Sequence, residues 1–207
     1  MHFTLTDLVT DITQNGVESG ADLVELDIAE SAAPAGKNIF RFTVKDNGKG
    51  MSKEEQQRAQ DPFVTDGVKH PNRKVGLGIP FLIQTADASC GGWKMESNKR
   101  DDAGTGGSMG TGGSYGTEIS AWFDLDNVDT PPVGDIPGMF RTVLLFNGPA
   151  EMVIRRVKEP APDNSGASLE YEVRKTELIN ALGNLEDTQS LILLDQYLRS
   201  LEEPGDE

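Results

Sequence analysis

Four short stretches of the sequence carry side chains and glycines whose types and spacing could form one polar site. Along the chain they are D-I-T-Q-N at residues 11–15, D-N-G-K-G at 46–50, G-L-G at 76–78 and G-T-E at 116–118. In the first stretch, an acid and an amide four residues apart would share one face of a helix. Each stretch alone has an ordinary explanation, because Asp-Asn-Gly is common turn chemistry and helical polar residues usually face solvent. Their order and their predicted surroundings favour a shared site.

The charge of the chain restricts its ligands. The 207 residues include 19 Lys and Arg against 34 Asp and Glu, a net charge of −15. Such a chain repels nucleic acid and anionic lipid, so we expect neither as a partner. An anionic ligand would have to be held locally, by backbone N–H groups or a few basic side chains. Solubility alone is the alternative explanation of the acidity.

Hydrophobic periodicity predicts the elements that position the first two stretches. Residues 5–18 have apolar side chains at helical spacing, which predicts a helix with Asp11 and Asn15 beside its core face. Residues 23–28 and 39–44 alternate between apolar and polar side chains, which predicts two half-buried strands. The second strand leads directly into Asp46.

The later elements complete an α+β domain over residues 1–123. Residues 52–60 begin with a capping-box pattern and predict a short helix. A long lid-like loop is expected at 61–75. It is followed by a helix that opens on G-L-G at 76–78 and stops at Gly91, in which Cys90 is predicted to be a core residue. Strands are predicted at 93–97 and 116–123, with a flexible Gly/Ser-rich insert between them at 99–115. We therefore expect a two-layer sandwich, with helices on one face of a mostly antiparallel, mixed sheet.

A second, smaller α+β unit is predicted after a linker at 124–134. Residues 135–207 contain a short apolar helix, a β-hairpin and two amphipathic helices. In the last helix four leucines recur at steps of three and four residues: Leu191, Leu194, Leu198 and Leu201. Burial in the core explains this stripe, and a surface for a homodimer or another partner is the alternative.

Residues 5–123 resemble the ATP-binding domain of the GHKL superfamily, which includes gyrase, heat-shock chaperone, histidine kinase and mismatch-repair ATPases. The segment D-P-F-V-T-D at 61–66 is similar to the "EPFFTT" segment of histidine kinases. Residues 74–97, from K-V-G-L-G to K-M-E-S, are similar to their glycine-containing helix and the following strand. The resemblance implies the GHKL fold, ATP as the ligand and Mg²⁺ as a cofactor.

The resemblance also implies roles for the residues that would bind the base. Asp46 would accept a hydrogen bond from the exocyclic amine of adenine, and a carboxylate would reject the carbonyl of guanine there. Gly48 and Gly50 would permit a close approach of the backbone, with Met51 beside them. Thr117 would support the same adenine edge through water.

The phosphate and metal roles fall on the other two stretches. Asn15 would be a ligand of Mg²⁺. The backbone of Gly76, Leu77 and Gly78 would bring N–H groups and a helix N-terminus to the phosphates. Lys74 would neutralise the γ-phosphate, and the neighbouring Arg73 and Lys69 are further candidates for that role. A solvated loop charge is the alternative for each of these three cations.

Asp11 is the candidate catalytic residue. In the hydrolytic members of the superfamily, a glutamate four residues before the asparagine acts as general base on the attacking water. Here the carboxylate is one methylene shorter, so Asp11 would work slowly, work through a second water, or only orient the Mg²⁺ shell. In histidine kinases this position is commonly an amide, so an acid argues against that role.

Three functions stay open at this point. The first is a slow, Mg-dependent ATPase that acts as a regulatory switch on a protein partner. The second is a protein kinase acting in trans, similar to the anti-sigma-factor kinases, and the third is a non-catalytic ATP-sensing subunit. The whole chain also resembles free-standing bacterial ATP-binding proteins of hydrogenase and NADH-dehydrogenase gene clusters, which implies a redox or hydrogenase-associated partner.

Several expected absences accompany these functions. The single cysteine excludes an internal disulfide, and no signal peptide or membrane span is predicted, so we expect a cytoplasmic protein. The only histidines are His2, near the terminus, and His70, in the lid. Because the ATP-binding domain begins at residue 5, no phosphoacceptor domain is expected before it. An autophosphorylating sensor kinase is therefore not expected.

Overall fold

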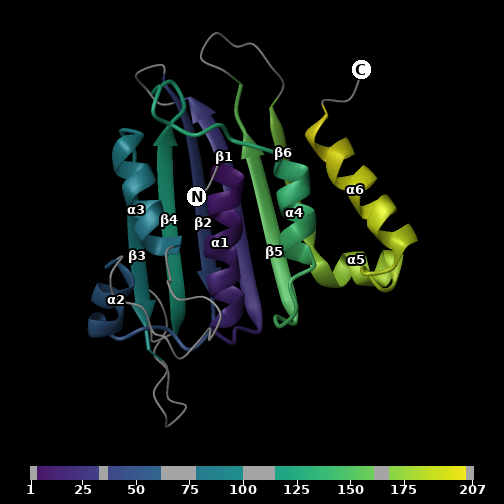
Figure 1. Cartoon of the computed structure of the whole chain (residues 1–207). Coiled ribbons are helices and arrows are strands. Elements are labelled where there is room, and N and C mark those ends of the chain that lie inside the picture. The colour runs from purple at the N-terminus through teal and green to yellow at the C-terminus, as the bar shows by residue number, and fades with distance from the viewer. Residues whose placement is uncertain (1–3, 33–36, 62–77, 100–114, 161–167, 204–207) are drawn as a thin grey trace.

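The computed structural model describes residues 4–32, 37–61, 78–99, 115–160 and 168–203. Its centre is one six-stranded sheet with the strand order β3-β4-β2-β1-β5-β6 (Figure 1). The strands are β1 Leu23–Ala32, β2 Asn38–Asp46, β3 Gly92–Asn98, β4 Gly116–Asp124, β5 Glu151–Lys158 and β6 Leu169–Arg174. Neighbouring strands are antiparallel except for β1 and β5, which are parallel.

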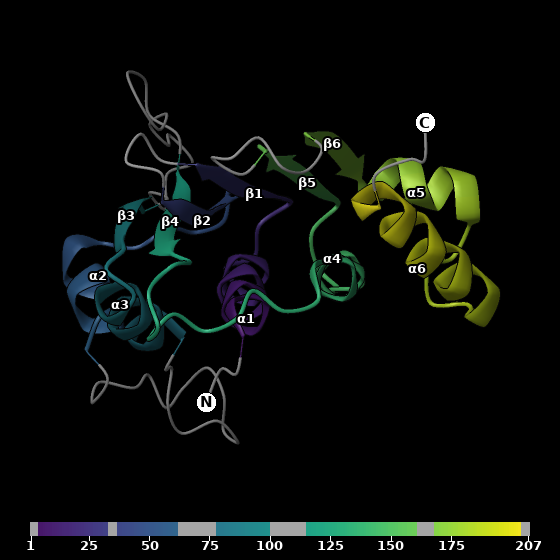
Figure 2. The ribbon, with the colours of Figure 1, turned by 90° about the horizontal axis from the view of Figure 1, so that it is seen from above.

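The helices lie on one side of this sheet. They are α1 Leu5–Glu18, α2 Lys53–Ala59, α3 Gly78–Ala88, α4 Ile136–Leu144, α5 Lys175–Leu182 and α6 Thr188–Glu202. Figure 2 shows α3, α1 and α4 side by side against the sheet, with α5 and α6 beyond its β6 edge. The predicted α+β fold class is confirmed. None of the described helices is long and apolar enough to cross a membrane.

The core forms where the predicted apolar faces meet. On β1 and β2 alternate side chains point to the helices, and each is at most 3% exposed: Val24, Leu26, Ile28, Phe40, Phe42 and Val44. Helix α1 contributes four apolar residues that are at most 1% exposed: Leu5, Leu8, Val9 and Ile12. Helix α1 begins at a capping box between Thr4 and Asp7. The predicted capping box between Ser52 and Glu55 begins α2.

The boundary predicted after residue 123 does not interrupt the sheet. Strand β5 pairs with β1 from Leu23↔Glu151 to Glu30↔Lys158, and β6 pairs with β5 as the predicted hairpin. The segment 124–134 lies against the start of α1, where Leu5 N donates to Pro132 O at 2.9 Å. Side chains from α4, β5, β6, α5 and α6 belong to the same hydrophobic core as those of the first strands.

The prediction for Cys90 was wrong. Helix α3 ends at Ala88, two residues before the cysteine, and the chain then turns with a left-handed backbone at Cys90 (φ 49°). This turn directs the thiol outward, so Cys90 is exposed rather than buried. Its sulfur accepts a hydrogen bond from Asn127 Nδ2 at 3.0 Å. The predicted lid and Gly/Ser-rich insert lie almost entirely outside the described residues.

A buried arginine connects the C-terminal helix to the sheet. Arg156 of β5 is fully buried, on the side of the sheet that carries the helices. Its guanidinium donates to Glu30 of β1 and, at 3.1 Å, to Glu202 of α6. Tyr171 Oη of β6 donates to the same Glu202 oxygen at 2.6 Å. One arginine therefore joins three parts of the fold through charged hydrogen bonds.

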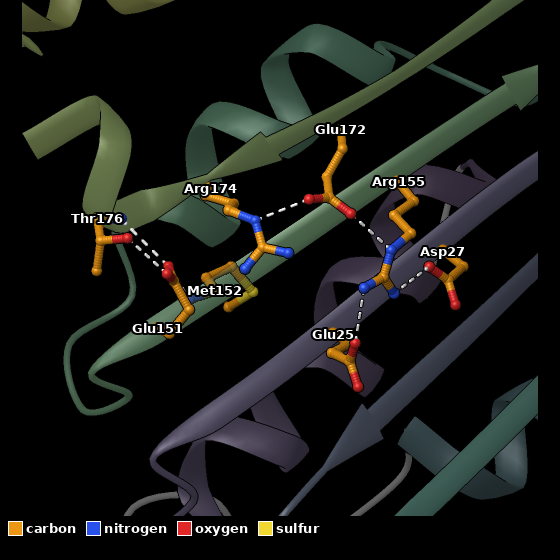
Figure 3. Close-up of polar contacts among 8 residues, drawn as sticks. All are labelled: Glu25, Asp27, Glu151, Met152, Arg155, Glu172, Arg174 and Thr176. Carbon is orange, nitrogen blue, oxygen red and sulfur yellow. Dashed lines mark hydrogen bonds and ion pairs between the residues drawn. The ribbon is translucent and has the colours of Figure 1, made fainter.

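The preceding residue, Arg155, makes three ion pairs in a more exposed environment, whereas Arg156 makes two. Because side chains alternate along a strand, Arg155 points to the opposite side of the sheet from Arg156. Figure 3 shows its guanidinium among three carboxylates, those of Glu25, Asp27 and Glu172 at 2.9, 3.3 and 2.8 Å. The Arg155 side chain is 40% exposed, so solvent screens these pairs.

The two arginines provide a matched test of burial. We expect Arg156→Met to lower the free energy of unfolding by about 3–5 kcal/mol, because it leaves the largely buried Glu202 without its cation and Glu30 with only Lys158, at 4.0 Å. We expect Arg155→Met to cost about 1 kcal/mol or less, because its carboxylates are more exposed. Urea unfolding followed by circular dichroism measures both values. Equal losses in the two variants would contradict the assigned role of Arg156.

Candidate functional site

Helix α1 and the end of β2 approach each other closely at Gly16. A Cβ atom at Gly16 would lie 3.5 Å from Asp46 Cβ and 3.6 Å from Asp46 Oδ2. These are ordinary van der Waals distances, so alanine would fit, and only a side chain larger than alanine would have to displace Asp46 or push the helix away from the strand. Asn15 and Asp11 lie on the same helix just before Gly16, so this contact also fixes where they lie relative to the Asp46 carboxylate.

Asp46 is a buried acid held by neutral donors. It is 6% exposed, and its Oδ1 accepts hydrogen bonds from Gly48 N and Ser19 Oγ, both at 2.9 Å. Burial raises the pKa of Asp46 above its ordinary value, while hydrogen bonds from Gly48, Ser19 and the Thr117 backbone oppose this shift. Sequence reasoning missed Ser19, because a serine at a helix end is usually explained as a cap.

The two glycines after β2 are required by their surroundings. A side chain at Gly48 would collide with the hydroxyl of Ser19 and crowd the Asp46 carboxylate. Gly50 has a left-handed backbone with φ 63°, and a Cβ there would collide with the carbonyl oxygen of Asn98. These glycines let the turn pack tightly against β3 and against the end of α1.

Thr117 and Met51 meet through a serine that sequence reasoning also missed. Thr117 lies opposite Asp46 in the β2–β4 register and is 7% exposed. Ser97 of β3 shares a hydrogen bond of 2.8 Å with Thr117 Oγ1, and its hydroxyl accepts from Met51 N at 2.8 Å. The register pair Ser97↔Thr117 could have identified it, but only once the strand order was known.

The N-terminus of α3 lies against the polar face of α1. A Cβ at Gly78, the first residue of α3, would lie 3.2 Å from Asn15 Nδ2 and 4.0 Å from Asp11 Cβ. The structure therefore brings together Asp11, Asn15 and Gly78. It also brings together Asp46, Gly48, Gly50, Met51 and Thr117. Five other predicted residues lie outside the described part of the chain: Lys69, Arg73, Lys74, Gly76 and Leu77.

The residues around Asn15 fit a weakly coordinated magnesium ion. Within the described residues, no group of three or more His, Cys, Asp or Glu side chains could hold a metal ion. An exposed asparagine amide and the half-buried carboxylate of Asp11 are the nearby oxygen donors on α1. Mg²⁺ is commonly held by one or two protein oxygens together with phosphate oxygens and water, and this donor set suits that arrangement.

Comparison with known proteins adds a family match to this geometry. A family model described as "Histidine kinase-, DNA gyrase B-, and HSP90-like ATPase" matches residues 3–127. No curated protein sequence matches the chain. The narrower likeness to proteins of hydrogenase gene clusters is not confirmed.

Several solved structures are similar to the chain. The N-terminal domain of a DNA repair protein is 13% identical with a TM-score of 0.48, over 81% of this chain and 52% of that one. The Aquifex aeolicus MutL ATPase domain complexed with ADP is 16% identical with a TM-score of 0.40, over 75% and 61%. Full-length ShkA in complex with AMPPNP is 14% identical with a TM-score of 0.33, over 58% and 30%. The chain spans less than two thirds of each of these structures.

The burial of Asp46 predicts a stability change in Asp46→Asn. A carboxyl whose pKa is raised by folding favours the folded state below its unfolded pKa and loses that contribution as the pH rises through the folded value. We therefore expect Asp46→Asn to be at least as stable as the wild type at about pH 7, because the amide carries no charge to bury.

The pH dependence of this difference provides the check. Urea unfolding of both proteins at about pH 7 and about pH 4 should show the advantage of the variant shrinking at the lower pH. A variant that is much less stable than the wild type at neutral pH would show that Asp46 serves to stabilise the fold.

Proposed function

The chain belongs to the family of histidine kinase-, DNA gyrase B- and HSP90-like ATPases, and from this premise we propose that it binds ATP with Mg²⁺ beside α1. The proposed site runs from the end of β2 to the start of α3. The observation that carries the proposal is the position of two consecutive residues of α1. Gly16 packs on the Asp46 carboxylate, and Asn15 lies against Gly78. A single helix therefore supports both the base end and the phosphate end of the proposed site.

In this proposal Asp46 recognises the adenine base. An ionised carboxylate has only acceptors, so it pairs with the exocyclic amine of adenine and disfavours the carbonyl of guanine. The hydrogen bonds from Ser19 and Gly48 hold the carboxylate in one orientation. Thr117, held by Ser97, is placed to support the same edge of the base through water.

The phosphates belong at the N-terminus of α3. Backbone N–H groups at a helix start, together with the helix dipole, attract anions. This arrangement answers the problem of holding ATP in a chain with a net charge of −15. Asn15 is the proposed protein ligand of Mg²⁺. The bound ion would neutralise part of the negative charge of the phosphates. We assign Lys74, Gly76 and Leu77 to the same phosphate site by their place in the family motif.

Asp11 is the proposed general base for hydrolysis. It lies one helical turn before Asn15 and faces the start of α3, so it is near the proposed position of the γ-phosphate. A carboxylate there can accept a proton from an attacking water directly or through a second water. The short aspartate side chain favours slow turnover. Slow turnover suits a regulatory switch, in which the nucleotide state changes the contacts with a protein partner.

The first test concerns the base. We expect Asp46→Asn to weaken ATP binding roughly 10- to 100-fold, because it replaces a charged acceptor of the adenine amine. Isothermal titration with a non-hydrolysable ATP analogue measures this affinity. The matching GTP analogue is the control, because the variant should also lose its preference for adenine. A folded variant that binds the ATP analogue as tightly as the wild type would refute the role of Asp46.

The second test concerns hydrolysis. We expect Asp11→Asn to lower phosphate release from Mg-ATP by about 10²–10⁴-fold while sparing ATP affinity, because only proton transfer is lost. Asp87→Asn is the matched control, since Asp87 is an exposed acid on α3 about 13 Å along the helix from Gly78. It should release phosphate at the wild-type rate.

Other outcomes of this test separate the alternatives. Equal phosphate release by the wild type and by Asp11→Asn would exclude Asp11 as the base. Tight binding without release by either protein would favour a non-catalytic ATP sensor. Phosphate transferred to a co-purified protein would favour a kinase that acts in trans.

A further inference from the structure

Three polar side chains form one row across the sheet at the base end of the proposed nucleotide site. Asp46 of β2 lies opposite Thr117 of β4, and Thr117 lies opposite Ser97 of β3. Residues directly opposite on antiparallel strands point to the same face of the sheet, with Cβ atoms about 4.5–5.5 Å apart. Thr117 therefore stands between the Asp46 carboxylate and the hydroxyl of Ser97.

Ser97 makes as many hydrogen bonds as a hydroxyl can make. Its Oγ accepts from Met51 N at 2.8 Å, donates to Gly116 O at 3.1 Å and shares a hydrogen bond of 2.8 Å with Thr117 Oγ1. A hydroxyl has one proton to donate and two lone pairs that accept. The three protein partners therefore use the full capacity of the Ser97 hydroxyl.

The chemistry of these partners fixes the direction of each bond. The N–H of Met51 can only donate, and the carbonyl of Gly116 can only accept. The single proton of Ser97 therefore goes to Gly116, and the bond between Ser97 and Thr117 has a proton only if Thr117 supplies it. Thr117 then has no proton left for another partner, so its Oγ1 presents only lone pairs to the base site.

We propose that Ser97 is a positioning residue for base recognition, because it holds the hydroxyl proton of Thr117 away from the bound purine. This inference rests on the proposed function, in which Asp46 binds the base and Thr117 supports it through water. It adds that the direction of the Thr117 hydroxyl, as well as its location, selects adenine.

The number of protons on the bridging water gives the basis of this selection. A water beside Thr117 must donate one of its two protons to Oγ1, so one proton is left for other acceptors. With adenine, the ring nitrogen next to the amine accepts this proton while the amine donates to Asp46. Hypoxanthine and guanine instead place a carbonyl next to the Asp46 carboxylate. One remaining water proton cannot satisfy both of these acceptors.

Without Ser97 the hydroxyl of Thr117 is free to turn. In Ser97→Ala its proton can point to the water, which then has both of its own protons to donate. One of them can go to Asp46 and the other to the carbonyl of hypoxanthine, so the water bridges the two acceptors. The variant should therefore tolerate a base that the wild type rejects.

Isothermal titration of the full chain with the non-hydrolysable analogues of ATP and inosine triphosphate tests the proposal. These ligands differ only at the amine or carbonyl edge of the purine. We expect Ser97→Ala to lower the preference for the ATP analogue about 10-fold, mainly through tighter binding of the inosine analogue. A purely structural role of Ser97 would weaken both ligands equally and leave this preference unchanged.

Ser120→Ala is the matched control. Ser120 is half-buried like Ser97 and shares a hydrogen bond of 2.9 Å with Thr43 of the neighbouring strand. It lies three residues after Thr117 on β4, so it points to the opposite side of the sheet. Loss of this hydroxyl should leave the preference for the ATP analogue at the wild-type value.

Two further variants keep the test decisive if Ser97→Ala fails to fold. Ser97→Thr retains a hydroxyl and should retain the preference for the ATP analogue. Ser97→Cys replaces the hydroxyl by a thiol, which is a weaker donor and acceptor, and should lower the preference by a smaller factor. Circular dichroism spectra identify the variants that are folded.

The possible results separate this inference from the proposed function. An unchanged preference in folded Ser97→Ala, or in folded Ser97→Cys where the alanine variant does not fold, would overturn the inference and leave the proposed function standing. A wild type that binds the two analogues equally well would also overturn it. A folded wild type that binds neither analogue would overturn the proposed function and this inference with it.

Discussion

The close packing of α1 on the two central strands is the constraint on which the rest of the structure depends. Four of its apolar side chains are buried against the sheet, and Gly16 allows the helix to touch the end of β2. Helix α1 also lies between α3 and α4, so its position sets theirs (Figure 2). A core packed to this density does not yield smoothly to a larger side chain. A displacement of α1 would therefore separate Gly16 from Asp46 and Asn15 from Gly78 at the same time.

Two buried charged side chains in this fold differ in whether a neighbouring opposite charge compensates their own. Arg156 is surrounded by carboxylates from β1 and α6, so its charge is compensated where it is buried. Asp46 is held only by a hydroxyl and backbone donors, and burial raises its pKa. A charge without a counter-ion makes folding less favourable, and such groups are concentrated at functional sites. The contrast supports a structural role for Arg156 and a binding role for Asp46.

Hydrophobic periodicity was enough to predict most of the helices and strands and the buried faces of α1, β1 and β2. Capping boxes at Thr4 and Ser52 follow from local chemistry, and the second was predicted from sequence. What could not be predicted depends on contacts between distant segments. The parallel pairing of β1 with β5 joined the C-terminal elements to the first sheet, although the composition of 124–134 resembles a linker. Ser19 became visible as a candidate site residue only after the packing of α1 on β2 had placed it beside Asp46, and Ser97 only after the strand order had placed it beside Thr117. Cys90 fits the helical period but lies past the end of the helix.

The parallel pairing of β1 and β5 also has a consequence for how the protein is made. Leu26 pairs with Ile154, 128 positions later (154 − 26). A ribosome adding about 5–20 residues per second needs roughly 10 s to synthesise the intervening chain. During that time β1 has one unsatisfied edge, a template on which nascent chains can pair wrongly. Glu25 and Asp27 lie on that strand and repel like-charged neighbours until Arg155 arrives with β5. We therefore expect the carboxylates that bind Arg155 in the finished protein also to disfavour wrong pairing of β1 during synthesis.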